Sequence, residues 1–402
     1  MAACAGLALP QGTAACAETA AAEHAIRVTG HIEAGITFQP DKPENGINFG
    51  HLATDRANQP VFNQALLNIE RPIDTAAKHV DPGFRVSLIY GSDARLTRLT
   101  GQFGGAVLGR TAFDVLEADF QAHLPVVFAG GIDIKLGQYV SPVGYEVIAA
   151  TDTLLYSHGY ILNFGAPIKH TGLLTISHPS RHVDVYAGVD SGTNTSILRD
   201  NNRAAGFLAG FGLNFPRVTF AALTHIGPEW PSGTPGVRPN RDLRYYSDAY
   251  VVWQVTDRLM AITEVNYVRD DGIKADGGGI AQYFAYTVSP KTRLALRAEV
   301  WRDSKGAYFG ALTGTNDLYN QQLGRPNAAI AGSPTTYAEL TLGVTRTFHD
   351  IGPLREVRWR PELRYDHALS GRPFNAGRRT DQFTLGFDVV IPFATGQRGP
   401  PT

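Results

Sequence analysis

Apolar and polar positions alternate along residues 26–38, IRVTGHIEAGITF. Ile32 and Phe38 fall on one side of this pattern, whereas His31 and Glu33 fall on the other. Successive side chains of a β-strand point to opposite faces, so the pattern predicts a strand with one apolar and one polar face. Its thirteen residues are about twice the usual length of a strand in a soluble protein.

The same alternation recurs along the whole chain and predicts sixteen strands in total. They span residues 26–38, 61–70, 83–90, 113–124, 131–140, 169–177, 182–190, 204–215, 217–226, 243–255, 257–268, 279–288, 292–302, 335–348, 354–366 and 381–393. Most have about nine to fourteen residues, which is the length that a tilted strand needs to cross a bilayer.

The connections between these strands alternate in length. From the fourth strand onward, every second connection is short: PVVFAGG, HPSR, Pro216, Thr256, SPK and HDIGP. The others are mostly long: 39–60, 91–112, 141–168, 191–203, 227–242, 303–334 and 367–380. Two connections depart from this alternation. Residues 71–82 stand where a short connection is expected but are long, and residues 269–278 are shorter than the other long connections. Short turns at one rim and long loops at the other are typical of an outer-membrane barrel.

We therefore predict an all-β fold, a transmembrane antiparallel up-and-down β-barrel of about 16 strands, within a range of 14 to 18. A closed barrel satisfies every backbone hydrogen bond in hydrocarbon and leaves no free sheet edge. The strands are too long for a soluble β-sandwich, and no repeat of 20 to 50 residues indicates a β-solenoid. A barrel of this size encloses a lumen wide enough for an aqueous channel.

Composition adds limits on partners and processing. The net charge of −1 gives no broad basic surface for nucleic acid, and no run of about 18 apolar residues predicts a transmembrane helix. Both cysteines, Cys4 and Cys16, precede the first strand, so the body has no cysteine metal site. Residues 1–17 resemble a signal-peptide remnant or a disordered tail. Residues 18–402 then form a single barrel domain, with strands from about 26 to 393 and a tail over 394–402.

Several segments are similar in sequence to a known family. They are GINFGHLATDRANQPVFNQALLNIERPID (46–74), GFRVSLIYGSDAR (83–95), GIDIKLGQYVSPVGYEVI (131–148), YSHGYILNFGAPIKHTG (156–172) and VYAGVDSGTNT (185–195). These blocks resemble the β-barrel porin family called BBP2, or OmpL-like. The resemblance implies a bacterial outer-membrane porin. General porins end on an aromatic residue, whereas here Phe393 is followed by ATGQRGPPT.

Residues 141–168 form the third long connection, the position that folds into the lumen in the sixteen-stranded porins that this chain resembles. The segment is rich in aromatic and aliphatic residues, which favours burial in the lumen over free exposure. We expect it to narrow the pore, with Glu146, Asp152 and His158 as its polar contributors. A structural cap over the barrel mouth is the alternative.

The inward faces of the later predicted strands carry alternating arginines and acids. In a water-filled lumen such arginines set ion selectivity, whereas pairing across neighbouring strands would make them a structural brace. The predicted lining of the pore and its constriction comprises Lys135, Glu146, Asp152, His158, Lys169, Arg293, Arg297, Arg358, Arg360 and Arg364.

Catalytic motifs are absent from the sequence: it has no GxSxG, HExxH or GxxxxGK[ST] pattern. His178 and His182 flank a short turn, and Asp270 and Asp271 lie with Asp276 in an acidic loop without EF-hand spacing, so neither group predicts a metal site. We expect no enzyme activity, cofactor or metal. The predicted function is an outer-membrane porin for passive diffusion of small hydrophilic solutes and ions, in contact with outer-membrane lipid and open to assembly as a homotrimer. An outer-membrane lipid hydrolase and a plugged structural or adhesion barrel are the alternatives.

Overall fold

The computed structural model describes residues 25–99, 110–198, 200–311 and 330–395. The predicted signal-peptide remnant, residues 1–17, lies outside these ranges, as does most of the predicted tail 394–402. Within the described part of the chain, no helix is long and apolar enough to cross a membrane.

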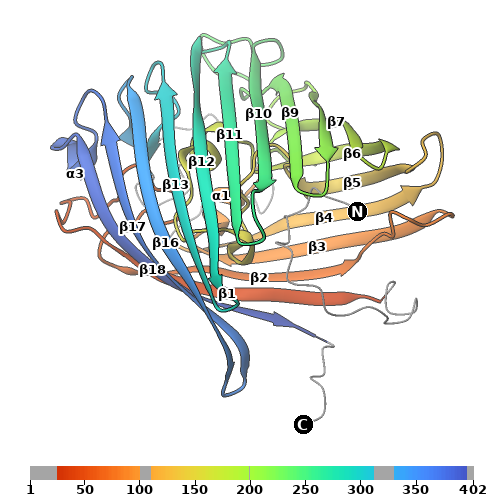
Figure 1. The fold of residues 1–402 in the computed structure, drawn as a ribbon. Coiled ribbons are helices and arrows are strands. Elements are labelled where there is room, and N and C mark those ends of the chain that lie inside the picture. Colours follow the sequence, from red (N-terminus) through yellow and green to blue (C-terminus); the bar gives the residue numbers. More distant parts are fainter. Residues whose placement is uncertain (1–24, 100–109, 199, 312–329, 396–402) are drawn as a thin grey trace.

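Sixteen antiparallel strands close into one barrel, as the sequence predicts (Figure 1). They are β1 (Arg27–Phe38), β2 (Pro60–Arg71), β3 (Asp81–Gly91), β4 (Ala112–Leu124), β5 (Ile132–Val140), β6 (Lys169–Ser180), β7 (Val183–Thr193), β8 (Gly206–Asn214), β9 (Val218–Pro228), β10 (Leu243–Gln254), β11 (Leu259–Asp270), β12 (Ala275–Ser289), β13 (Thr292–Asp303), β16 (Thr336–Ile351), β17 (Leu354–Ala368) and β18 (Asp381–Ala394). Each strand pairs with its neighbours in the chain, and β1 pairs with β18 to close the ring.

The two faces of the barrel differ sharply in polarity. On β13, the side chain of Val300 is 46% exposed, whereas the adjacent Glu299 is 2% exposed and Trp301 is fully buried. Across the described strands many large apolar side chains are exposed, whereas many charged side chains are buried. This arrangement is the reverse of a soluble protein, and it places the apolar wall against lipid.

Connections at the two rims differ in length, as predicted. The short-turn rim includes the links 181–182, 215–217 and 290–291, whereas the long-loop rim includes 39–59 and 141–168. Among the described residues, the long connections contain four short helical segments: α1 (Ala94–Thr97), η1 (Ala150–Asp152), η2 (Ile161–Gly165) and α3 (Phe374–Gly377).

Strand β12 begins at Ala275, four residues earlier than the sequence pattern predicts. Gly277 and Gly279 interrupt the apolar and polar alternation, but they belong to the strand. The ring of Trp301 on β13 lies across them and occupies the space of their missing side chains. A Cβ built at Gly277 or Gly279 would lie 2.7 Å from an atom of this ring. The connection between β11 and β12 therefore shortens to residues 271–274.

A small two-stranded sheet, β14 (Gly310–Ala311) with β15 (Ile330–Ala331), was not predicted. It belongs to the long connection between β13 and β16. Phe309, next to this sheet, stacks on Tyr337 of β16 with ring centroids 3.6 Å apart. Phe309 also contacts Tyr160 and Phe164, so an aromatic cluster joins two long loops to the inner wall.

Candidate pore constriction

Residues 141–168, here called the inner loop, lie inside the ring of strands (Figure 1). Three glutamates on the inner wall accept hydrogen bonds from its backbone amides. Glu264 of β11 binds the amide of Tyr145 at 2.7 Å, and Glu299 of β13 binds that of Tyr160 at 2.6 Å. Glu362 of β17 binds the amide of Tyr156 at 2.9 Å. The wall thereby satisfies backbone donors that a loop without regular structure leaves free.

Arginines on the same wall donate to carbonyl groups of the inner loop. Arg297 reaches the carbonyl oxygen of Ser157 at 2.7 Å, and Arg364 reaches that of His158 at 2.7 Å. Arg360 donates to the carbonyl oxygen of Ala150 at 2.8 Å. Together with the glutamates, these contacts hold the inner loop against β11, β13 and β17.

Glu146 is the charged residue of the inner loop that the wall holds most directly. Its carboxylate lies 2.9 Å from Arg297 Nη1, accepts the amide of Gly159 at 2.8 Å, and lies 3.8 Å from His158 Nδ1. Burial alone would raise the pKa of Glu146, but Arg297, His158 and the amide of Gly159 outweigh it and lower the pKa to about 2. Glu146 and Arg297 are therefore in direct contact, with no aqueous path between them.

Arg360 and Arg364 also have acidic partners on the wall. Arg360 pairs with Asp388 of β18 and with Glu33 of β1, the latter at 2.9 Å. Arg364 pairs with Asp366 at 2.8 Å. Both arginines are almost completely buried, so their charges are neutralised within the packed lumen.

A second set of charges keeps partial access to solvent. Asp152, at the end of η1, interacts with Arg358 of β17 and Arg85 of β3. Burial raises the pKa of Asp152, and these two guanidinium groups oppose the rise. The side chains of Arg358 and Arg85 are 19% and 25% exposed. Arg358 also donates to the carbonyl oxygen of Thr151 at 2.7 Å, which places it beside the loop.

Arg293 of β13 differs from the other arginines of the lumen. Its Nε has no hydrogen-bond partner among the described residues, and its charge is repelled by Arg358 and Arg360. The structure therefore brings Arg293, Arg358 and Asp152 to the same part of the lumen.

The two predicted lysines occupy different positions. Lys135 is half-buried on β5, opposite Gln121 of β4. Lys169 is fully buried, and its Nζ lies 2.5 Å from Asp114 of β4 and donates to the carbonyl oxygen of Val115 at 2.8 Å. Lys169 thus ties β6 to β4 and has no exposed surface in the lumen.

The histidines and aspartates that the sequence places beside turns do not form a metal site among the described residues. His182 Nδ1 donates to the carbonyl oxygen of Asn214 at 2.7 Å, whereas His178 binds Asp133 and Asp184. Asp270 pairs with Arg244 at 2.6 Å.

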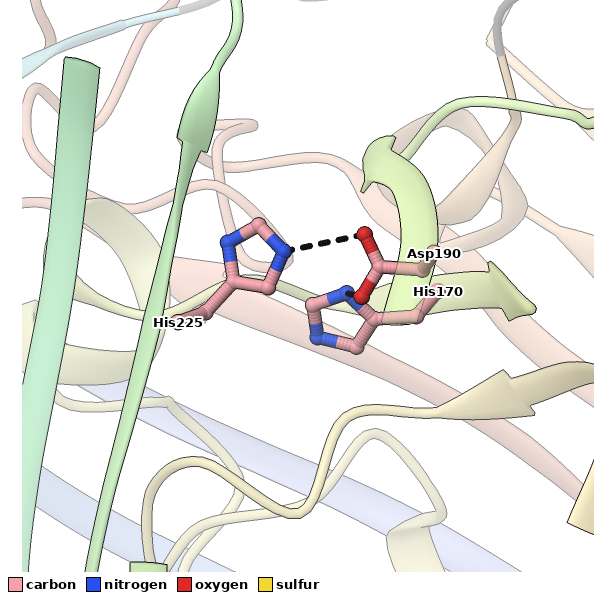
Figure 2. Close-up of side chains that lie close together, drawn as sticks. All are labelled: His170, Asp190 and His225. Atoms are coloured by element: carbon pink, nitrogen blue, oxygen red, sulfur yellow. Dashed lines mark hydrogen bonds and ion pairs between the residues drawn. The ribbon is translucent and has the colours of Figure 1, made fainter. Parts of the chain in front are cut away.

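Two histidines and one aspartate lie close together in the structure and were not predicted from the sequence (Figure 2). His170, Asp190 and His225 are 20 and 35 residues apart in the chain and lie on β6, β7 and β9. Such wide spacing leaves no local motif.

The closed barrel, the apolar outer wall, the long loops at one rim and the charged lumen define an outer-membrane porin. The chain belongs to the family described as "Putative beta-barrel porin-2, OmpL-like", whose model matches residues 25–393. The protein is thus located in the bacterial outer membrane.

Solved porin structures share the fold at low sequence identity. The chain is similar to the outer membrane channel DcaP of Acinetobacter baumannii, with 9% identity and a TM-score of 0.55 over 92% of this chain and 96% of that one. It is similar to OprB of Pseudomonas putida, with 12% identity and a TM-score of 0.55 over 93% and 95%. An anion-selective porin from Comamonas acidovorans has 8% identity and a TM-score of 0.54 over 92% and 99%. No curated protein sequence matches the chain.

Proposed function

We propose that small hydrophilic solutes and ions diffuse passively through a constriction between the inner loop and one side of the barrel wall. Asp152 lines the loop side, and Arg85, Arg293 and Arg358 line the wall side. The observation that carries this proposal is the division of the lumenal charges into two sets. The first set is buried in pairs that hold the loop, whereas the second keeps partial exposure.

The predicted site residues take three roles in this proposal. Asp152, Arg293, Arg358 and Lys135 face the permeation path. Glu146, His158, Arg297, Arg360 and Arg364 position the inner loop. Lys169 supports the wall.

Arg293, whose Nε has no hydrogen-bond partner among the described residues, favours anions over cations at the constriction, because fixed charges in a narrow aqueous path raise the local concentration of counter-ions. Arg85 and Arg358 contribute less than Arg293, since Glu117 lies 2.7 Å from Arg85 and Glu356 lies 2.6 Å from Arg358. The Comamonas acidovorans porin with this fold is described as anion-selective, which is consistent with this preference.

A flux assay tests the proposal. Liposomes containing the refolded barrel are placed in solutions of neutral sugars of increasing size, and swelling is followed by light scattering. We expect rapid entry of the smallest sugars and a graded decline with size. A plugged barrel would give no swelling above that of protein-free liposomes.

We further propose that the barrel acts as a homotrimer. OmpT of Vibrio cholerae, which is similar to this chain at 12% identity with a TM-score of 0.52, has been solved in a trimer form. Light scattering of the detergent-solubilised protein should give three times the mass of one chain after subtraction of detergent. The mass of a single chain would contradict the trimer.

One arrangement favours an alternative, hydrolytic function. Ser141 Oγ lies 3.0 Å from His170 Nε2, and His170 Nδ1 lies 3.1 Å from Asp190 Oδ2, in the order of a Ser-His-Asp triad. However, the contact between His170 and Asp190 lacks hydrogen-bond alignment, and Ser141 Oγ already accepts the amide of Val143. We propose that the protein has no hydrolase activity. Ester or phospholipid hydrolysis that Ser141→Ala abolishes would overturn this.

A further inference from the structure

The group of His170, Asp190 and His225 lies on the inner wall near the long-loop rim. His170 is the second residue of β6, and Asp190 and His225 lie three residues before the ends of β7 and β9. One potential ligand atom from each residue lies within 4.8 Å of the other two, and all three side chains are buried. Two imidazoles and one carboxylate form a donor set that suits divalent transition metals.

Each imidazole directs one nitrogen at Asp190 (Figure 2). The other nitrogen lies near a second polar group. His225 Nε2 lies 3.0 Å from Asp190 Oδ1, and its Nδ1 lies 3.8 Å from Glu229. His170 Nδ1 lies 3.1 Å from Asp190 Oδ2, and its Nε2 lies 3.0 Å from Ser141 Oγ. His170 has the arrangement of metal-binding histidines, in which the outer nitrogen is oriented by a carboxylate or hydroxyl group. His225 Nδ1 has no hydrogen-bond partner among the described residues.

Two atoms at the centre of the group have no hydrogen-bond partner among the described residues: His170 Nδ1 and Asp190 Oδ2. They are close in distance but are not aligned as donor and acceptor. Buried polar atoms normally have hydrogen-bond partners, so two neighbouring atoms without an aligned hydrogen bond are suited to bind a common ligand.

A second histidine cluster provides the contrast. His178 Nδ1 binds Asp184 at 2.6 Å and its Nε2 binds Asp133 at 3.1 Å, both with hydrogen-bond geometry. Both ring nitrogens of His178 are therefore satisfied by protein groups, which makes His178 a matched control.

A glycine keeps space open beside the ligand atoms. A Cβ built at Gly206 of β8 would lie 2.5 Å from His225 Nε2 and 2.6 Å from Asp190 Oδ1. Any larger residue would therefore displace these two atoms.

We propose that His170 Nδ1, His225 Nε2 and the carboxylate of Asp190 bind one divalent transition metal ion of the Zn²⁺ class. Ligand atoms of a tetrahedral zinc site are about 3.4 Å apart, given bonds of about 2.1 Å. The contacts of the two imidazoles with the two Asp190 oxygens, at 3.0 and 3.1 Å, are near this spacing, and one ligand atom from each of the three residues lies within 4.8 Å of the others. Three protein ligands leave the fourth position to water. Because Ser141 is the first residue of the inner loop, the bound ion also anchors the base of that loop.

Metal titration of the refolded full chain in detergent tests this proposal. Because the ligands are buried, Zn²⁺ is supplied in one series during refolding and in another afterwards, and bound zinc is measured after desalting. We expect one zinc per chain. Co²⁺ in its place should give visible absorption bands of a four- or five-coordinate ion.

Four variants localise the ion. Asp190→Asn and His225→Gln should each weaken binding at least a hundredfold, whereas Ser141→Ala, which alters only an outer partner, should weaken it about tenfold. Gly206→Ala retains every ligand and should still lose most of the affinity. The control His178→Gln should bind zinc as the wild type does.

Heat-dependent mobility on SDS gels establishes that each variant is folded. Wild-type protein without bound zinc in both series would overturn the proposal. So would zinc binding that folded Asp190→Asn retains, or that His178→Gln loses equally.

Discussion

Arg297 Nη1 on the barrel wall lies 2.9 Å from Glu146 Oε1 in the inner loop. Both side chains are buried, and Arg297 has a second acidic partner in Glu339 at 2.6 Å. Some of the lumenal charges that the sequence assigns to ion selectivity therefore hold the inner loop against the barrel wall. Selectivity then depends on the fewer charges that keep partial exposure, such as Arg358, and on Arg293, whose Nε has no hydrogen-bond partner among the described residues.

Replacement of Glu146 by Gln should loosen the inner loop without unfolding the barrel. The change removes a charged hydrogen bond to Arg297, worth about 1.5 to 3 kcal/mol, while Glu339 still balances the guanidinium charge. We expect a lower urea midpoint and noisier single-channel currents. Asp257→Asn is the control: it removes an exposed ion pair with Arg217, and no measurable change should follow.

The same carboxylate gives a pH dependence with a defined sign. The pKa of Glu146 falls from an ordinary value of 4.5 to about 2 in the folded protein. A lowered folded-state pKa stabilises the seated loop above pH 4.5, and this contribution is lost as the pH falls from 4.5 toward 2. Current noise in the wild type should be constant from pH 7 to pH 5 and should rise below about pH 4.

The variant Glu146→Gln isolates this effect from other carboxylates. Its noise should already be high at pH 7, and it should lack the rise that Glu146 causes. An equal rise in both proteins would assign the pH dependence to other groups.

Ion selectivity should respond to the partly exposed charges. Arg293→Gln and Arg358→Gln should each shift the reversal potential in a salt gradient toward cation preference, whereas Asp152→Asn should shift it the other way. A unit charge about 10 Å away in water contributes about 0.4 kcal/mol, or about twofold in permeability ratio. The shifts should shrink at 1 M salt, where the Debye length is about 3 Å. A shift of the reversal potential toward anion preference in Arg293→Gln would exclude Arg293 from the permeation path.

The closed ring of hydrogen-bonded strands predicts resistance to SDS. Because β1 pairs with β18, no edge strand is available from which the detergent can unravel the sheet. Unheated samples should migrate differently from boiled ones on SDS gels. Identical mobility of the two samples would contradict a closed barrel.

The strands could be predicted from the sequence because a lipid-facing barrel enforces strict alternation. Segments such as 292–302 carry that pattern along almost the whole of β13. The start of β12 could not be predicted, because its glycines resemble a turn until Trp301 is seen lying across them. Local sequence does not encode that cross-strand packing.

The candidate site was only partly accessible from the sequence. Alternation places Arg297, Arg358 and Arg360 on the inward face, and the composition of residues 141–168 indicates burial. Which arginine is paired and which is free depends on long-range contacts, such as Arg360 with Glu33, 327 residues away. The histidine group depends in the same way on the register of four neighbouring strands.

Single-channel recording in a planar bilayer tests the central claim most directly. The wild-type barrel should give discrete, stable open steps, and deletion of residues 147–156 should increase the conductance of each step, because the segment around η1 narrows the lumen. Both proteins must first show the heat-dependent mobility of a folded barrel. Absence of open steps in the wild type, or equal conductance in the two folded proteins, would contradict a pore narrowed by the inner loop.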